Sequence, residues 1–294
     1  MKKTALLLML TALCLLLSSC TALGYVYPDG DEYTAGEGRI TARVEELDIS
    51  WLDGSVIVNY HDGDAIILRE ESDKQLDSDK ELHWRLEDET LHVKYAASGF
   101  RALPSLDKQL TVLLPESLRL DEAKITVASA QVEADGLRAD EIHIQSASGQ
   151  VALRQAGQAK EIRVETASGG VAVAVEDAQQ MKITTASGQV VVDALQLEDV
   201  KAATASGTVV LQFAGEPDKI EADSVSGNVT IRLPEKVGFT AEVDSVSGRV
   251  GGNMEIRRRG DDTYVHGSGT LDVEVDTVSG NVFFEVNEGA GREI

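Results

Sequence analysis

A six-residue motif, [Ser/Thr]-[Ala/Val]-Ser-Gly-x-Val, occurs seven times in the second half of this 294-residue chain. Its central pairs are Ser148-Gly149, Ser168-Gly169, Ser187-Gly188, Ser206-Gly207, Ser226-Gly227, Ser247-Gly248 and Ser279-Gly280. Successive serines are separated by 20, 19, 19, 20, 21 and 32 residues. A degraded copy at Ser129 has Ala130 where the others have glycine. Such spacing is typical of folds that stack one structural unit on the next.

Apolar residues alternate on both sides of each motif, as they do in half-buried β-strands. In one copy Ile162 and Val164 precede the motif, whereas Val171, Val173 and Val175 follow it. The inward positions therefore change from even to odd numbers at the Ser-Gly pair. Glycine accepts a positive φ, so this pair is predicted to form a corner between two strands. Polar connectors, such as residues 176–179 and 215–218, are expected to close each coil.

These connectors are too short for the helix that joins parallel strands in a βαβ unit. We therefore predict an all-β fold, a single-stranded β-solenoid similar to a parallel β-helix, with about 20 residues per coil over residues 121–287. Residues 288–294 would form a tail. Corner residues of successive coils would then align in columns. One column of hydroxyls is expected to hydrogen-bond within itself and to the corner backbone: Ser146, Thr166, Thr185, Thr204, Ser224, Ser245 and Thr277.

Residues 39–120 are less regular and are predicted to form an irregular β segment that caps and starts the stack. Residues 49–58 read as an early coil with its corner at Gly54, and residues 82–95 read as a hairpin. The 32-residue step contains an insertion, residues 254–265, predicted to be a hairpin that leaves the stack. It includes Arg259-Gly260-Asp261, the tripeptide recognised by animal integrins. A turn between two strands explains this tripeptide without any function, and we favour the turn.

The first twenty residues indicate export and lipid attachment. Lys2 and Lys3 precede an apolar run over residues 5–17, which is too short to span a bilayer. The run ends in Leu-Ser-Ser-Cys at residues 17–20, which resembles the lipobox of bacterial lipoproteins. The resemblance implies a signal peptide over residues 1–19 and a lipid on Cys20 that anchors the chain to the extracytoplasmic face of the cell membrane. An ordinary secretory signal with an accidental cysteine is the alternative. Residues 20–38 are interpreted as a tether.

Charge and residue types exclude several functions. The formal charge is −23, and it would become −25 without residues 1–19, which argues against binding nucleic acid. The serines are not expected to be nucleophiles, because no histidine keeps a fixed spacing to them. The five histidines are His61, His83, His92, His143 and His266. We expect no catalytic residue, metal or cofactor. Calcium-binding β-roll and EF-hand patterns are absent from the sequence.

The lipobox, the early coil at residues 51–58, the hairpin and the seven Ser-Gly-x-Val coils together resemble a bacterial adhesin-type domain family of unknown function that includes LiaG-like proteins. The resemblance covers about residues 38–287. It implies a β-solenoid in a membrane-anchored envelope protein and transfers no catalytic or ligand residue. Ala130 departs from the repeat and leaves the geometry of that corner open.

Three functions are compatible with this sequence. The favoured one is a binding, adhesion or scaffold module of the cell envelope, whose partner is an envelope protein or a cell-wall polymer. The second is a self-assembling structural protein, because residues 282–286 would lie in the last coil with an exposed apolar edge. The third is a polysaccharide-active enzyme. Its acidic candidates are scattered over connectors: Glu133, Asp135, Asp140, Glu141, Glu198 and Asp199.

Overall fold

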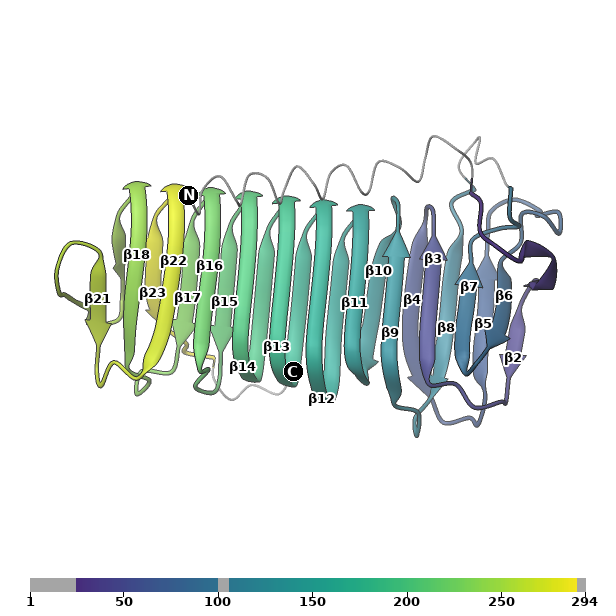
Figure 1. Cartoon of the computed structure of the whole chain (residues 1–294), viewed down its shortest axis with the longest axis horizontal. Helices are drawn as coiled ribbons and strands as arrows, with labels where there is room; N and C mark the ends of the chain where they lie inside the picture. The colour runs from purple at the N-terminus through teal and green to yellow at the C-terminus, as the bar shows by residue number, and fades with distance from the viewer. Residues whose placement is uncertain (1–24, 100–105, 290–294) are drawn as a thin grey trace. The chain divides into compact units, whose positions relative to one another are not determined.

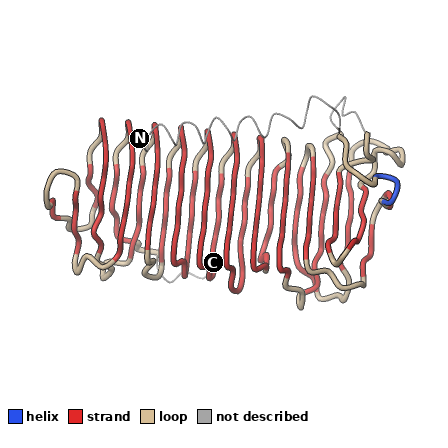
Figure 2. The backbone as a smooth tube through the Cα atoms, viewed as in Figure 1, coloured by secondary structure: helices blue, strands red, loops and turns tan. Residues whose placement is uncertain are grey.

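The computed structural model of the chain describes residues 25–99 and 106–289. Most of their backbone is β-strand joined by loops and turns, with a short 3₁₀ helix, η2 (Gly30–Glu32), near the start (Figure 2). The chain divides into two compact units, residues 1–154 and 155–294, and β12 (Val151–Ser168) contains the division. The predicted all-β fold is confirmed. In the part of the chain that the structure describes, no helix is long and apolar enough to cross a membrane.

Unit 1 consists of two rows of strands, and corners join the rows. In spatial order, row A contains β1 (Thr34–Ala35), β6 (His83–Glu87), β7 (Thr90–Lys94), β3 (Glu46–Trp51), β9 (Leu120–Val127) and β11 (Ala139–Ser148). Row B contains β2 (Gly38–Ile40), β5 (Ile66–Glu71), β8 (Gln109–Pro115), β4 (Ser55–His61) and β10 (Gln131–Leu137). The strands β7, β3, β9 and β11 are parallel, as are β8, β4 and β10. Antiparallel β1, β2, β5 and β6 form the irregular part, and β6 with β7 is the predicted hairpin.

Unit 2 also consists of two rows of strands joined by corners, again named A and B, and its two longest strands run through both rows. β13 (Val171–Ser187) and β14 (Val190–Ser206) pair in parallel over almost their whole length. Beyond β14, row A contains β16 (Lys219–Ser226), β22 (Leu271–Ser279), β18 (Phe239–Ser247) and β21 (Thr263–His266). Row B contains β15 (Val209–Phe213), β17 (Val229–Leu233), β23 (Val282–Val286) and β19 (Val250–Gly252). The prediction that residues 176–179 form a polar connector is wrong, because these residues belong to β13 and Ala178 is buried.

The last two strands of unit 2 are not at its end (Figure 1). β22 lies between β16 and β18, and β23 lies between β17 and β19. The expected exposed edge at residues 282–286 is therefore wrong, because both edges of β23 are paired and Phe284 is fully buried. The corner at Ser247 is the outermost one of this unit. The insertion forms the predicted hairpin from β20 (Arg257–Arg258) and β21, but β21 joins row A by pairing with β18.

Five corner glycines have the positive φ that the repeat predicted: Gly149, Gly169, Gly188, Gly207 and Gly227, with values from 129° to 152°. Gly248 and Gly280 lie outside that region, yet close packing still requires glycine there. A Cβ at Gly280 would be 1.9 Å from the carbonyl oxygen of Gly227. Ala130 fits its corner without a positive φ, and its carbonyl oxygen packs against Gly149.

The inward hydroxyl column forms, but its predicted hydrogen bonds mostly do not. Register partners align Thr185, Thr204, Ser224 and Thr277 on neighbouring strands, and all four are buried. Their hydroxyl oxygens have no hydrogen-bond partner within the described residues, and the same is true of Ser146 and Ser245. Thr166 alone in this column donates a hydrogen bond to a corner carbonyl, that of Ser168, at 3.1 Å. The parallel register holds these hydroxyls in line at the spacing of neighbouring strands, about 4.8 Å, which exceeds the length of a hydrogen bond.

The predicted tether is corrected for the residues that the structure describes. Residues 25–38 pack against the rest of unit 1: the Tyr25 hydroxyl donates to the Ser50 carbonyl at 2.8 Å, and the Tyr27 hydroxyl donates to the Ala96 carbonyl at 2.9 Å. β1 and β2 then pair with β6 and β5. Tyr25, Tyr27 and Tyr33 pack edge to face on one another within this segment. The hydrogen bonds and strand pairings attach the segment to the rest of unit 1.

The core of each unit is built mainly from aliphatic side chains, as a chain with only 4% aromatic residues requires. Inward residues alternate with outward ones along most of each long strand, which buries one face of each row. The few fully buried aromatic side chains are Trp51, Tyr95, Phe213, Phe239 and Phe284. This close packing places the Ser-Gly corners in fixed columns.

Candidate functional site

The corners of unit 2 form a continuous polar face. Register pairs Ser187 with Ser206, Ser206 with Ser226, and both Ser226 and Ser247 with Ser279. All these serines are exposed, because each is the last residue of a row A strand and points away from the core. Their side chains therefore recur at the spacing of neighbouring strands, about 4.8 Å. The predicted columns of corner residues are present in the structure.

Backbone hydrogen bonds between successive corners keep this face rigid. The amide of Gly188 donates to the Ser206 carbonyl at 3.0 Å, and the amide of Gly207 donates to the Ser226 carbonyl at 3.1 Å. The same contact links Gly227 to Ser279 and Gly280 to Ser247. The serine carbonyls are thus used within the stack, whereas the hydroxyls remain available to a partner.

The outermost corners of unit 2 enclose a shallow polar depression. Its lining consists of Thr208, Ser226, Gly227, Asn228, Ser247, Gly248, Arg249, Ser279, Gly280 and Asn281. Two asparagines order its floor: the Asn228 side-chain oxygen accepts the amide of Asn281 at 2.9 Å, and the Asn281 oxygen accepts the amide of Arg249 at 3.1 Å. Arg249 is exposed and is the only charged residue of the lining.

Chemically, this depression offers hydrogen bonds and one positive charge. Serine hydroxyls donate and accept, whereas the Arg249 guanidinium donates and attracts anions. No aspartate, glutamate, histidine, lysine or cysteine belongs to its described lining, so a serine there has no neighbouring general base. Elsewhere among the described residues, no group of three or more histidine, cysteine, aspartate or glutamate side chains is arranged to hold a metal ion.

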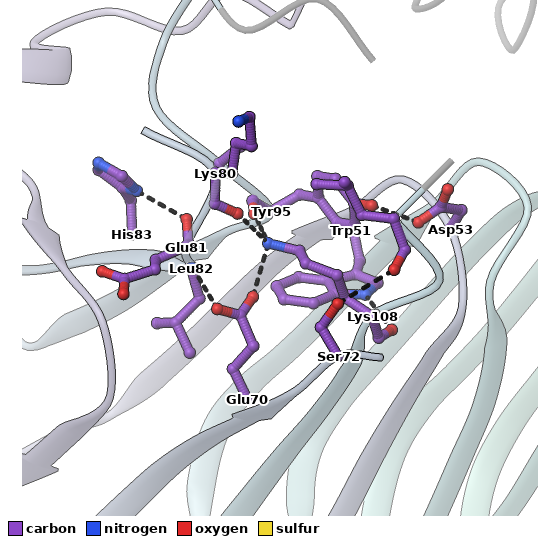
Figure 3. A network of polar contacts seen from close by, with 12 residues as sticks. Trp51, Asp53, Glu70, Ser72, Lys80, Glu81, Leu82, His83, Tyr95 and Lys108 are labelled. Carbon is purple, nitrogen blue, oxygen red and sulfur yellow. Dashed lines mark hydrogen bonds and ion pairs between the residues drawn. The ribbon is translucent and has the colours of Figure 1, made fainter. Parts of the chain in front are cut away.

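A second polar cluster, which the sequence did not reveal, surrounds Lys108 in unit 1 (Figure 3). Lys108 is fully buried, and its Nζ lies 2.5 Å from Oε1 of Glu70. The same Nζ donates to the carbonyl of Lys80 at 2.6 Å and to that of Tyr95. It also lies 4.1 Å from the ring centroid of Tyr95 and 5.0 Å from that of Trp51. A lysine between strands normally indicates an exposed residue, so no sequence signal marked it.

The surroundings of Lys108 shift its pKa and those of Glu70 and Tyr95. Burial lowers the pKa of Lys108 and raises the pKa of Glu70, and their mutual contact opposes both shifts. Burial and the hydrogen bond to Asp53 raise the pKa of Tyr95. The Lys108 carbonyl accepts hydrogen bonds from the Trp51 indole at 3.3 Å and the Ser55 amide at 3.0 Å. Lys108 has no exposed surface, and its carbonyl packs against Gly54. We therefore interpret this cluster as a structural clamp at the Gly54 corner.

The remaining predicted residues are placed as follows. Cys20 and the signal peptide lie outside the described residues, so lipid attachment stays a prediction. His266 stacks on Phe239, and His92 contacts Asp48 at 2.9 Å. Neither histidine lines the depression. Arg259-Gly260-Asp261 lies in the exposed turn between β20 and β21, with the Arg259 amide donating to the Thr263 carbonyl at 2.8 Å. The turn interpretation of this tripeptide accounts for its position.

Residues 44–284 match the Toastrack DUF4097 family over most of the chain. The chain belongs to this family. Its membership is consistent with the β-solenoid-like repeat described above and confirms the expected resemblance to adhesin-type domains of unknown function.

Several solved structures are similar to this Toastrack chain. A proposed adhesin from Bacteroides fragilis is 11% identical, with a TM-score of 0.48, and the match covers 86% of this chain and 96% of that one. A proposed lipid-binding protein from Parabacteroides distasonis is 14% identical, with a TM-score of 0.47 and coverage of 87% and 97%. A proposed adhesin from Parabacteroides merdae is 12% identical, with a TM-score of 0.43 and coverage of 87% and 97%. No curated protein matches the chain.

Proposed function

We propose that this chain is a lipid-anchored binding or adhesion module on the extracytoplasmic face of the cell membrane, and that it binds a hydroxyl-rich cell-wall polymer. The observation that carries the proposal is the polar depression, where serines and asparagines from three neighbouring corners surround Arg249. A polymer presents the same groups repeatedly, as this face does. A shallow polar surface suits such contact better than it suits enclosure of a small molecule.

The negative charge of the chain limits which polymers it can bind. Asp and Glu outnumber Lys and Arg by 50 to 27, so a strongly anionic polymer would be repelled by most of the surface. Arg249 places one positive charge within the depression, and this charge can bind an occasional carboxylate or phosphate on an otherwise neutral polymer. We therefore expect a mostly uncharged glycan with isolated acidic groups.

The binding surface can be tested with the full chain in detergent, sedimented with purified insoluble cell-wall material. Arg249→Ala and the double substitution Ser226→Ala/Ser279→Ala should each lower the bound fraction several-fold. Arg257→Ala is the matched control, because this exposed arginine lies on β20 and lines no part of the depression. Equal sedimentation of all four proteins would contradict the proposed surface, and absence of sedimentation of the unsubstituted chain would contradict the polymer.

The anchor requires its own experiment. In bacterial cells supplied with labelled palmitate, Cys20→Ser should abolish labelling and release the protein from the membrane fraction. Cys14→Ser serves as the control, because this residue would be removed with the signal peptide and should not affect labelling. Persistent labelling of Cys20→Ser would show that the lipid is absent from this position.

A further inference from the structure

The strands β22 and β23 occupy a slot between segments that precede them in the sequence. β22 pairs with β16 on one side and with β18 on the other, and β23 pairs with β17 and β19. Among the described residues, no register pairing links β16 or β17 to β18 or β19. The slot strand pair, residues 271–286, is therefore what attaches β18 and β19 to the rest of unit 2.

The contacts in this slot are extensive and depend on the repeat itself. Val273, Val275, Val282 and Phe284 of the slot strand pair are buried, and the ring centroid of Phe284 lies 4.6 Å from that of Phe239. The corner glycines interlock, since Gly280 packs on the carbonyl of Gly227 and Gly248 packs on the carbonyl of Gly280. An empty slot would leave one edge of each of the four flanking strands, β16, β17, β18 and β19, unpaired. Unpaired edges of this kind recruit strands of matching sequence.

A short glycine-containing link joins the slot strand pair to the preceding hairpin. β21 ends at His266 and β22 begins at Leu271, so residues 267–270 form the link. Gly267 and Gly269 have φ values of 56° and 73°, and the Gly269 amide donates to the His266 carbonyl at 3.2 Å in a turn. Glycines at these positions allow the link to open into an extended conformation at little cost.

We propose that the slot also accepts the strand pair of a second copy of this chain, so that two copies associate by exchanging residues 271–286. Each exchanged pair would make the same strand pairings, glycine contacts and Phe239–Phe284 stack as in the single copy. Asn287 would move with the exchanged pair and make its hydrogen bonds to Leu233 and Phe213 in the second copy. The backbone conformation would change at residues 267–270, so protein concentration would determine which form predominates. The proposal does not depend on the polymer or the lipid proposed above.

Interchain disulfides can detect this exchange directly. Glu221 and Glu274 are register partners on β16 and β22, and both face outward. Neighbouring parallel strands bring such a pair of cysteines within disulfide distance. In full chains carrying Cys14→Ser and Cys20→Ser, one copy receives Glu221→Cys and a differently tagged copy receives Glu274→Cys. The two are unfolded together, refolded at high concentration and oxidised.

Two controls are measured beside the mixed copies. Separate copies with Lys182→Cys and Lys201→Cys test partners on β13 and β14, which do not exchange, and they measure random cross-linking. A single chain with both Glu221→Cys and Glu274→Cys reports whether the register forms. We expect the mixed Glu221/Glu274 copies to cross-link at least several-fold more than the Lys182/Lys201 copies. A yield equal to that control, or failure of the single chain to cross-link, would overturn the proposal.

Shortening the link provides an independent measurement. Deleting Ser268 and Gly269 leaves two residues to reverse the chain, which disfavours the closed single copy. The deleted chain should therefore shift from monomer to dimer in analytical ultracentrifugation. A deleted chain that stays monomeric and folded at high concentration would contradict exchange.

Discussion

Replacing Gly188 with alanine should destabilise unit 2 strongly, although the change adds only one carbon atom. The φ of Gly188 is 145°, a conformation that residues with a Cβ rarely adopt. A Cβ there would lie 2.0 Å from the carbonyl oxygen of Gly169 and 2.7 Å from its carbon. That carbonyl belongs to the next corner of the stack, so the corner cannot move without disturbing its own hydrogen bond to Ser187.

Two costs add at this position. Holding a residue with a Cβ in a sparsely populated φ region costs about 1–3 kcal/mol, and forcing an extra carbon into a packed site costs about 1–3 kcal/mol more. For a domain of this size, a total near the middle of that range lowers the melting temperature by on the order of 10 °C. Thermal unfolding of the purified full chain, followed by circular dichroism, measures this change. Gly188→Val should unfold at a lower temperature still, because its side chain is branched at Cβ.

Gly170 provides a matched control on a neighbouring corner. Its φ lies outside the left-handed region, and a Cβ there would come no closer than 3.9 Å to another atom, the carbonyl oxygen of Gln189. Gly170→Ala should therefore change the free energy of unfolding by no more than about 0.5–1 kcal/mol, in the stabilising direction if at all. Equal melting temperatures for Gly188→Ala and Gly170→Ala would show that the corners do not depend on glycine as described.

Three further perturbations test other parts of the structure. Lys108→Met would leave Glu70 buried without its cation, which should lower the free energy of unfolding, measured with urea, by about 3–5 kcal/mol. Adding Glu70→Gln to this variant should restore part of the lost free energy, because the buried carboxylate is then absent. Burial and the neighbouring carboxylates raise the pKa of Asp223, so the folded state binds this proton more tightly and loses stability as pH rises above about 3.8. Asp223→Asn should therefore raise the melting temperature at pH 7, and the gain should shrink as the pH approaches 3; a gain that is constant with pH would refute this assignment. Deleting residues 271–294 should abolish hydrogen-exchange protection in residues 239–266 as well, because β18 and β19 are attached through the deleted strands. Retained protection there would contradict the strand order.

Much of this fold could be predicted from the repeat because the corner is a local structure. The phase change between alternating apolar residues, together with a glycine at a constant position, marks where each strand turns. Connectors too short for a helix then require direct stacking, which gives parallel register and aligned columns of serines. The hairpin of β6 and β7 could also be predicted, since it needs only two alternating runs and a polar turn.

The order of strands at the outer part of unit 2 could not be predicted in this way. The motifs around Ser226, Ser247 and Ser279 are nearly identical, so each could pair with either of the others at similar energy. What distinguishes them is packing at a distance, such as Phe239 on Phe284 and β21 along β18. The candidate site follows from this order, because Arg249 reaches Asn281 through stacking and not through sequence proximity.

The Lys108 clamp escaped prediction for a similar reason. Glu70 and Tyr95 lie 38 and 13 residues away from Lys108 in the sequence, and no local pattern relates a charged side chain to such distant partners. A repeat of near-identical, short-range elements thus specified the shape of each corner and the direction of stacking. The sequence of coils along the stack, the placement of Arg249 and the burial of a lysine depended on contacts between distant segments, which exist only once the chain has packed.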